Sequence, residues 1–322
     1  MIKRTLYFGN PAYLSLQQAQ LKVRLPEVEK TIEEGYQGLS AEGAEKFKKE
    51  ATVNIPIEDI GVVILDHQQI VITQALIGAL LDNNVAIINC DKQHLPSGLF
   101  LALAGHTLQS ERFKHQIEAS QPLKKNLWQQ TISAKIYNQA ALLAYAGHEH
   151  ENMLYWAESV KSGDGQNHEA RAAAYYWSTL FSKKIQEFKR HREGDAPNNL
   201  LNYGYAILRA IVARGLVASG LLPTLGIFHR NKYNAYCLAD DIMEPYRPFV
   251  DKMVYDIVMH HDDYEVLSIE LKKELLKIPA LDIYINGERS PLMVGLQRST
   301  ASLARCFEGT QRKIVYPEFK IT

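Results

Sequence analysis

The sequence contains 322 residues, of which 46% are hydrophobic and 22% are charged. This is the composition of a globular protein, so a disordered or fibrous chain is excluded, and the length fits one large or two ordinary domains. Lys and Arg total 36 and Asp and Glu also total 36. The resulting formal charge of zero excludes a strongly basic nucleic-acid-binding sleeve, although it does not exclude a local basic face.

The first 100 residues carry the patterns of short strands. Residues 12–16 alternate apolar with polar side chains, which is the period of a half-buried strand. Residues 60–65 are a β-branched run typical of a buried strand. Residues 27–50 are rich in Glu, Lys and Gly, which predicts an exposed loop or hairpin tip, and residues 74–83 have helical spacing. Strands or strand edges are expected at 5–8, 12–16, 21–25, 52–56, 60–65, 66–73 and 85–90.

Beyond residue 100 the period of the apolar residues changes to that of helices. Apolar side chains recur three and four residues apart, and Pro96-Ser97-Gly98 is the predicted boundary. The fold class is therefore α+β, with a small β-rich N-terminal domain at 1–98 followed by a larger all-α domain at 99–322. A small strand-turn insertion is expected at 282–287. Helices are expected at 108–119, 127–145, 152–161, 169–191, 199–220, 240–260, 268–276 and about 291–307.

The N-terminal residues and the cysteines indicate the cellular compartment of the protein. Residues 1–10 have no apolar core, so we expect no secretory signal. The apolar stretch 70–88 is interrupted by polar residues and is too polar to span a bilayer. The three cysteines, Cys90, Cys237 and Cys306, form no Cys-x-x-Cys pair, which favours a reducing compartment. We therefore expect a soluble cytoplasmic protein that does not associate with membranes.

Three patches contain residues that could carry chemistry. Gly163-Asp-Gly leads into a predicted helix with Glu169 in its first turns, and His229 follows Gly226-Ile-Phe. Asp241 and Glu244 lie three residues apart on a predicted helix. Taken singly, each patch has a structural explanation, such as helix capping, a core histidine or a solvated acidic face. Taken together, carboxylates and an imidazole without a thiolate suit Mg²⁺ or Mn²⁺ and phosphoryl transfer on nucleic acids.

Four blocks of the sequence resemble one known family in their order and spacing. Three blocks are the patches around Glu169, His229 and Glu244, and the fourth is Asp195-Ala-Pro-Asn-Asn-Leu-Leu-Asn-Tyr-Gly-Tyr. The chain resembles the CRISPR-associated integrase or endonuclease, the larger, metal-dependent subunit of the spacer-acquisition machinery. The resemblance covers nearly the whole chain and is greatest to the versions that accompany type II systems.

The resemblance implies a metal site and a set of partners. By motif position the metal ligands are Glu169, His229 and Glu244, with Asp241 at a nearby acidic position, and the ion is Mg²⁺ or Mn²⁺. Many members carry Asp where this chain has Glu244, so the division of labour between Asp241 and Glu244 stays open. Expected partners are double-stranded DNA, a second copy of the chain bound through the β-rich domain, and a small CRISPR adaptation subunit.

The implied reaction joins the 3′-hydroxyl ends of short duplex DNA into the CRISPR repeat by transesterification. The DNA must also be held, and the densest basic run lies shortly after Glu169. Such runs are more often solvated helix faces, and the aromatic cluster 175–177 is more often core than a base-stacking surface. The candidate DNA-binding residues are Lys183, Lys184, Lys189, Arg190 and Arg192.

Two other functions stay open from the sequence. The same site could serve a metal-dependent nuclease that acts on branched DNA. Alternatively, the chain could be a DNA-binding scaffold without catalytic activity, in which the acidic residues only cap helices. Loss of strand transfer on removal of Glu169 would exclude the scaffold, and hydrolysis without a joined product would favour the nuclease.

Overall fold

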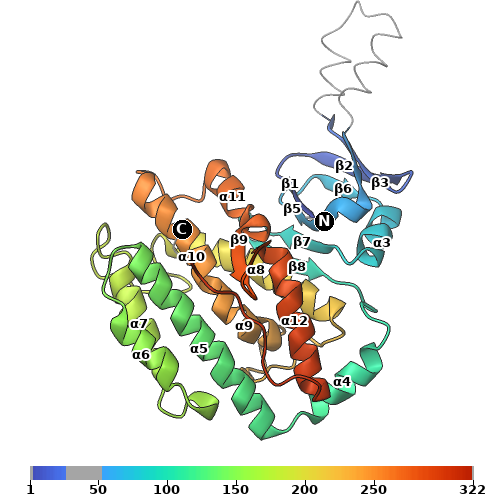
Figure 1. The fold of residues 1–322 in the computed structure, drawn as a ribbon. Helices are drawn as coiled ribbons and strands as arrows, with labels where there is room; N and C mark the ends of the chain where they lie inside the picture. The colour runs from blue at the N-terminus through green and yellow to red at the C-terminus, as the bar shows by residue number, and fades with distance from the viewer. Residues whose placement is uncertain (1–2, 27–52, 321–322) are drawn as a thin grey trace, which may run out of the picture. The chain divides into compact units, whose positions relative to one another are not determined.

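The computed structural model describes residues 3–26 and 53–320, and the chain divides into two compact units, Met1–Leu103 and Ala104–Thr322 (Figure 1). The first unit is rich in strands and the second is helical, which confirms the predicted fold class. The boundary predicted at Pro96–Gly98 falls inside a strand, because these residues pair with the preceding strand of the same sheet. The loop or hairpin tip predicted at 27–50 lies outside the described residues.

One sheet of the first unit has the strand order β1-β5-β7-β8. β1, β5 and β7 run parallel and β8 is antiparallel to β7. The β-branched run predicted as a buried strand is β5, and each of its residues is buried. A parallel strand covered on both faces requires such a continuous apolar run. The strands span Arg4–Phe8 (β1), Ile60–Leu65 (β5), Ala86–Cys90 (β7) and Pro96–Phe100 (β8).

The second sheet of this unit has the order β4-β3-β2-β6 and shares its core with the first sheet. Leu14 and Leu21 from this sheet, Val63 from β5 and Leu76 from a helix belong to one buried cluster. The alternating pattern of 12–16 predicted this half-buried arrangement. The elements span Ala12–Gln17 (β2), Gln20–Arg24 (β3), Val53–Pro56 (β4), Ile70–Ile72 (β6) and Gln74–Asp82 (α3), with a short 3₁₀ turn at Ile57–Asp59.

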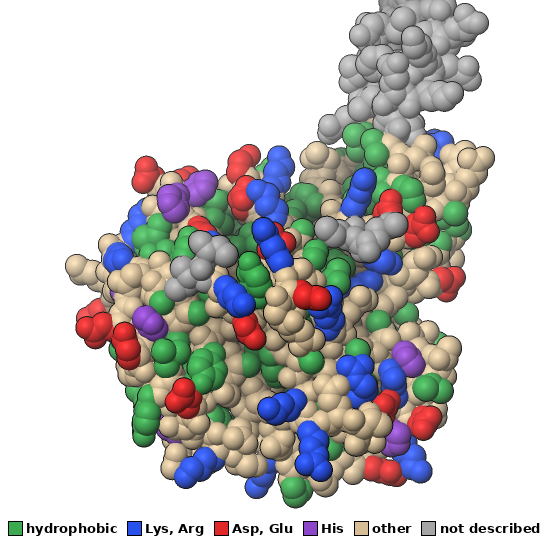
Figure 2. All heavy atoms as spheres, viewed as in Figure 1, with side chains coloured by type: hydrophobic (Ala, Val, Ile, Leu, Met, Phe, Trp, Pro, Cys, Tyr) green, Lys and Arg blue, Asp and Glu red, His purple; other side chains and the backbone are tan. Residues whose placement is uncertain are grey.

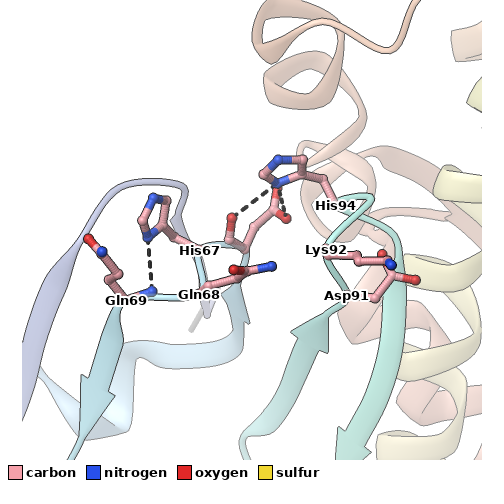
Figure 3. Close-up of a pocket in the computed structure, with 7 residues that line it drawn as sticks. His67, Gln68, Gln69, Asp91, Lys92 and His94 are labelled. Carbon is pink, nitrogen blue, oxygen red and sulfur yellow. Dashed lines mark hydrogen bonds and ion pairs between the residues drawn. The ribbon is translucent and has the colours of Figure 1, made fainter.

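Polar side chains line a pocket of about 350 Å³ where β5 and β7 end (Figure 3). The Asp66 side chain is buried, and it accepts hydrogen bonds from the Tyr7 hydroxyl at 2.5 Å and from His94 Nδ1 at 2.9 Å. Burial and the adjacent Asp66 carboxylate raise the pKa of Tyr7. These bonds satisfy the buried carboxylate and join the ends of three segments of the unit. The pocket is lined by Asp66, His67, Gln68, Gln69, Asp91, Lys92 and His94.

The second unit consists mainly of helices, and its long helices occupy the predicted places. α5 begins earlier than predicted, at Gln121, because the Ser120 hydroxyl accepts the Leu123 N–H and caps the helix. The helices span Gln109–Glu118 (α4), Gln121–Tyr145 (α5), Glu151–Ser159 (α6), His168–Leu180 (α7), Asn198–Ala218 (α8), Cys237–Met243 (α9), Arg247–His260 (α10), Ile269–Leu275 (α11) and Leu292–Glu308 (α12). A hairpin of β9 (Asp282–Ile285) and β10 (Glu288–Pro291) precedes α12.

α8 is the central helix of this unit. It packs against α9, α10, α11 and α12, and Gly204 permits close approach because an added Cβ would lie 2.5 Å from Val250 Cγ1. Among the described residues, α8 is the one helix long and apolar enough to cross a membrane, and 78% of its apolar window is buried inside the fold. Its apolar character is therefore accounted for by helix packing within the unit.

Two predicted helix boundaries are wrong, the first for a tertiary reason and the second for a local one. α7 ends at Leu180, not at 191, because the Asn198 side chain binds the backbone of Lys189 and His191 and holds that segment in turns. The helix predicted at 240–260 is interrupted, since a 3₁₀ turn at Glu244–Tyr246 separates α9 from α10. Proline at 245 has no N–H to continue the helical hydrogen bonds.

The buried Asp251 carboxyl group should make the stability of the protein depend on pH. It lies buried on α10 and accepts hydrogen bonds from the Tyr176 hydroxyl at 2.8 Å and from the Tyr205 hydroxyl. Burial raises the pKa of Asp251 from 3.8 to about 6, although both hydroxyls favour the charged form. The folded state therefore binds this proton more tightly than the unfolded chain. The contribution of Asp251 to stability is complete below pH about 4 and is lost as the pH rises through about 6.

Replacing Asp251 with asparagine should remove this dependence. Relative to the Asp251→Asn variant, the wild-type free energy of unfolding should fall by about 2 kcal/mol between pH about 4 and about 7. Urea denaturation of both proteins across that range measures the difference. A difference that stays constant with pH would show that the carboxyl group is already ionised at the acid end.

Candidate active site

One face of α5 supplies two side chains to the candidate site. Trp128 and Lys135 are seven residues apart, which places them on the same face of the helix two turns from each other. Trp128 is fully buried and Lys135 is 8% exposed. A buried lysine is costly unless its charge is paired, so its partners indicate where the acidic residues gather.

The Lys135 ammonium lies between two glutamates from distant segments. Its Nζ is 2.8 Å from Glu169 Oε1 and 2.7 Å from Glu244 Oε2. Burial by itself would lower the pKa of Lys135, but Glu244 and Glu169 outweigh it and the pKa is raised. Lys135 therefore carries its positive charge, and α7 and the Glu244–Tyr246 turn are joined at this point by a cation.

The glycine-containing turn before α7 positions Glu169. Asp164 Oδ2 accepts the Glu169 N–H at 2.9 Å and Asp164 Oδ1 accepts the His168 N–H at 2.9 Å. Asp164 thus satisfies two of the N–H groups that a helix leaves unpaired at its start. The Glu169 side chain is 24% exposed. It is therefore accessible to solvent while its backbone is held firmly.

Glu244 is more deeply buried than Glu169. It lies in the 3₁₀ turn after α9, and its side chain is 6% exposed. Arg247 NH2 lies 3.0 Å from Glu244 Oε1. Burial would raise the pKa of Glu244, but Arg247 and Lys135 outweigh it and the pKa is lowered. Glu244 is therefore ionised, and its Oε2 has a close ammonium group at an angle that makes no hydrogen bond.

His229 is held by Asp241. The Asp241 side chain is fully buried. Its Oδ2 accepts the N–H groups of Ile227 at 2.7 Å and Phe228 at 3.0 Å, and its Oδ1 accepts the His229 N–H at 3.2 Å and lies 2.5 Å from His229 Nδ1. This hydrogen bond to Asp241 raises the pKa of His229, against the effect of burial. With Nδ1 bound to Asp241, Nε2 is the nitrogen left for a ligand or a proton.

Gly226 is required for this arrangement. A Cβ at this position would lie 2.8 Å from Asp241 Oδ2, which is closer than such atoms approach in proteins, and closer still to the His229 carbonyl oxygen. A side chain here would therefore push the loop off Asp241. The Gly-Ile-Phe-His sequence owes its glycine to this close approach between the loop and the carboxylate.

The structure joins Glu169 to Glu244 through Lys135 and joins His229 to Asp241, while metal binding by these four residues stays a prediction. Glu169 and Glu244 share Lys135, and both act on the charge of His229, since each raises its pKa. Asp241 accepts bonds from the 226–229 loop with both oxygens, so it positions His229. Asp240, the other acid in the patch, pairs with Arg209 at 2.6 Å.

Lys135 is the residue that sequence reasoning missed. It lies in a helix whose apolar side chains define the buried face, and a single lysine in such a helix usually extends to solvent. The available signal was its spacing of seven residues from Trp128, which places a charge in line with the buried face.

In the structure, three of the five residues in the predicted basic run donate hydrogen bonds to other parts of the chain. Lys183 donates to the Ala146 carbonyl, Lys184 donates to the His261 carbonyl at 3.0 Å, and Arg190 donates to Asn198 at 2.8 Å. Lys189 and Arg192 are exposed outside the helices. On the face shown in Figure 2, basic and acidic side chains are interspersed over the helical unit. DNA binding by Lys183, Lys184, Lys189, Arg190 and Arg192 therefore stays a prediction.

Comparison with known proteins agrees with the resemblance seen in the sequence. Residues 42–268 match the family model described as CRISPR associated protein Cas1. The chain belongs to this family. A CRISPR-associated endonuclease Cas1 from Neisseria meningitidis is 37% identical over 250 residues, which cover 77% of this chain and 81% of that protein.

Solved structures share the Cas1 fold. A structure titled "Casposase bound to integration product" superposes with a TM-score of 0.74 at 18% identity, over 99% of this chain and 95% of the other. A Cas1 protein from Thermotoga maritima superposes with a TM-score of 0.71 at 14% identity, over 97% and 99%. A chain of a "Cas6-RT-Cas1--Cas2 complex" superposes with a TM-score of 0.70 at 19% identity, over 99% of this chain and 37% of the other.

Metal binding at this Cas1 site stays a prediction, and the donor set fits it in part. Within residues 3–26 and 53–320, no group of three or more His, Cys, Asp and Glu side chains is arranged to hold a metal ion. However, Glu169 and Glu244 already face one cation, the Lys135 ammonium. The buried Glu244 Oε2 makes no hydrogen bond. Two carboxylates and an imidazole nitrogen are ligands that Mg²⁺ and Mn²⁺ accept.

Proposed function

We propose that this Cas1-family chain joins the 3′-hydroxyl ends of short duplex DNA to the CRISPR repeat. In this reaction a P–O bond forms to the attacking 3′ oxygen and the P–O bond to the 3′ oxygen of the repeat strand breaks, which leaves a new 3′-hydroxyl. The observation that carries the proposal is the convergence of Glu169 and Glu244 on one buried cation, the Lys135 ammonium. The charges of both carboxylates also raise the pKa of His229. The printed title of the casposase structure, which names an integration product, supports joining over simple cleavage.

The residues of the chain would hold the metal ion and keep its ligands charged and correctly placed. Glu169, Glu244 and His229 Nε2 would hold a divalent ion, which supplies Lewis acidity at the phosphoryl group when bound. Asp241 holds the His229 ring so that Nε2 faces away from the loop. Arg247 keeps Glu244 ionised and in place. A negatively charged pair of glutamates would otherwise repel a DNA phosphate, so the positive charges around it are needed for binding.

Partners follow from the chemistry and from named relatives. We propose double-stranded DNA as substrate and target, a second copy of this chain bound through the β-rich unit, and a small CRISPR adaptation subunit. One structural neighbour is named as a complex that contains Cas1 and Cas2. The zero formal charge of the chain supports a need for partners, because an isolated neutral chain has modest affinity for DNA. Such an assembly would act on DNA in the cytoplasm.

A second candidate is a metal-dependent nuclease that acts on branched DNA. The printed name of the Neisseria relative, an endonuclease, favours it. In that reaction water replaces the 3′-hydroxyl as the attacking group, and the same side chains would serve. The two candidates differ only in the group that attacks, so the products separate them.

The test supplies the purified chain, with and without the small partner subunit, with a short duplex that has free 3′-hydroxyls and a plasmid that carries a CRISPR repeat. We expect covalent joining in Mg²⁺ or Mn²⁺ and none after chelation by EDTA. A duplex with 3′-dideoxy ends is the control and should not be joined. Cleaved DNA without joined product would support the nuclease, and joining that continues in EDTA would contradict the proposed metal.

A further inference from the structure

An exposed aromatic ring lies directly beside the candidate active site. Phe228 precedes His229, and its side chain belongs to the exposed large hydrophobic residues, at 46% exposure. Its N–H is bound by Asp241 Oδ2 at 3.0 Å, so its backbone is fixed to the same carboxylate that orients His229. An exposed apolar side chain held this firmly requires an explanation other than a flexible loop.

One face of the Phe228 ring is already covered. The ring stacks on the buried Trp128 with centroids 4.2 Å apart and planes 3° from parallel. The exposed area of Phe228 therefore includes the opposite face of its ring. His229 meets both rings edge-on, with centroids 5.5 Å from Trp128 and 5.6 Å from Phe228. The two rings thus form a stacked pair, and the His229 imidazole lies at the edge that the two rings share.

The residues around the stacked Phe228–Trp128 pair are of the kinds that bind nucleic acid. Arg230 and Lys232 follow in the same loop and are exposed, and Arg230 NH2 is held by Gln121 Oε1 of α5 at 2.9 Å. Gln121 and Trp128 are seven residues apart on α5, so one helix face anchors the loop at two points. Proteins bind unpaired nucleotides with aromatic rings that stack on the bases and with nearby cations that contact the phosphates.

We propose that the outer face of Phe228 stacks on the base of the nucleotide next to the phosphodiester that reacts, with that base unpaired from its complement. The proposal rests on the proposed function, since the ligand is the DNA of that reaction. Stacking would fix the nucleotide relative to His229 and the two glutamates without reading its sequence, because every base has a flat π face. Phe228 is then a positioning residue that binds substrate.

The experiment pairs a change in the protein with a change in the DNA. Phe228→Leu keeps apolar bulk but removes the ring, and a set of substrates carries one abasic site at successive positions around the reacting phosphodiester. We expect Phe228→Leu to slow joining of intact DNA by about tenfold. An abasic site at one flanking position should slow the wild type by a similar factor, and the variant should then be no slower than the wild type on that substrate.

Two further variants make the result decisive. Phe228→Trp should restore joining because it keeps a stacking ring, and Tyr155→Leu, at a 67% exposed tyrosine on α6, should leave joining unchanged. The proposal is overturned if Phe228→Leu joins intact DNA at the wild-type rate. It is also overturned if the variant is slowed equally on intact DNA and on every abasic substrate, since that pattern indicates a structural role.

A binding measurement separates this proposal from the proposed function. The DNA carries 2-aminopurine at the flanking position, whose fluorescence falls when the base stacks. We expect quenching on binding to the wild type and to a Glu169→Gln variant, and loss of quenching with Phe228→Leu. If the wild type joins no DNA but still quenches the probe, the proposed reaction fails and the stacking site stands. Equal quenching by the wild type and Phe228→Leu removes the stacking site.

Discussion

Glu169→Gln should reduce strand joining by at least about a hundredfold, because it removes one of the two carboxylate charges that converge at the candidate site. The substitution keeps the shape of the side chain. Lys135 retains its contact with Glu244 at 2.7 Å, and the Glu169 N–H retains its bond to Asp164. The variant should therefore fold and assemble as the wild type does. The joining assay with duplex DNA and a repeat-bearing plasmid measures the effect.

The matched control is Glu151→Gln. Glu151 is also a glutamate in the first turn of a helix, α6, but it is exposed. If the acidic residues served only to favour helix N-termini, the two variants would behave alike. Full joining activity in Glu169→Gln would contradict a catalytic role for Glu169 and would leave helix capping as its role. Loss of activity in both variants would point to a general requirement for helix stability instead.

Lys135→Met should destabilise the metal-free protein by about 3–5 kcal/mol, because it leaves two neighbouring carboxylates without their shared cation. Glu244 is the more costly of the two, since its side chain is 6% exposed and would keep only Arg247 as a partner. Urea denaturation in the presence of EDTA gives the free energy of unfolding. Wild-type stability in this variant would contradict a paired, charged Lys135.

The same variant also tests the metal prediction without an activity measurement. A divalent cation must compete with the Lys135 ammonium in the wild type, whereas in Lys135→Met the glutamates are unpaired. Mn²⁺ should therefore raise the unfolding midpoint of the variant more than that of the wild type. Lys252→Met removes a half-exposed pair with Asp256 and should cost less than about 1 kcal/mol, with the same response to Mn²⁺ as the wild type. Equal Mn²⁺ responses in all three proteins would exclude binding at the two glutamates.

Local sequence patterns were sufficient for much of the fold. The alternation at 12–16 and the β-branched run at 60–65 depend on burial of neighbouring residues in one element, and both strands formed as predicted. The end of α7 was not predictable in this way. Its helical pattern continues past Leu180, but Asn198, from the start of another helix, binds the backbone of the segment that follows. Such competition comes from outside the segment and leaves no local signal.

The candidate site, too, was predictable from local sequence patterns only in part. Glu169, His229 and Glu244 could be named from motifs because turn glycines and acidic spacing are local features of the chain. The role of Asp241 and the presence of Lys135 were decided by tertiary structure. Both side chains are buried, and their partners come from segments far along the chain: the 226–229 loop for Asp241, and α7 and the Glu244–Tyr246 turn for Lys135. The sequence by itself determined which residues could carry the chemistry. Only the tertiary structure decided which charges neutralise one another, because a buried charge takes its partners from whatever the fold places beside it.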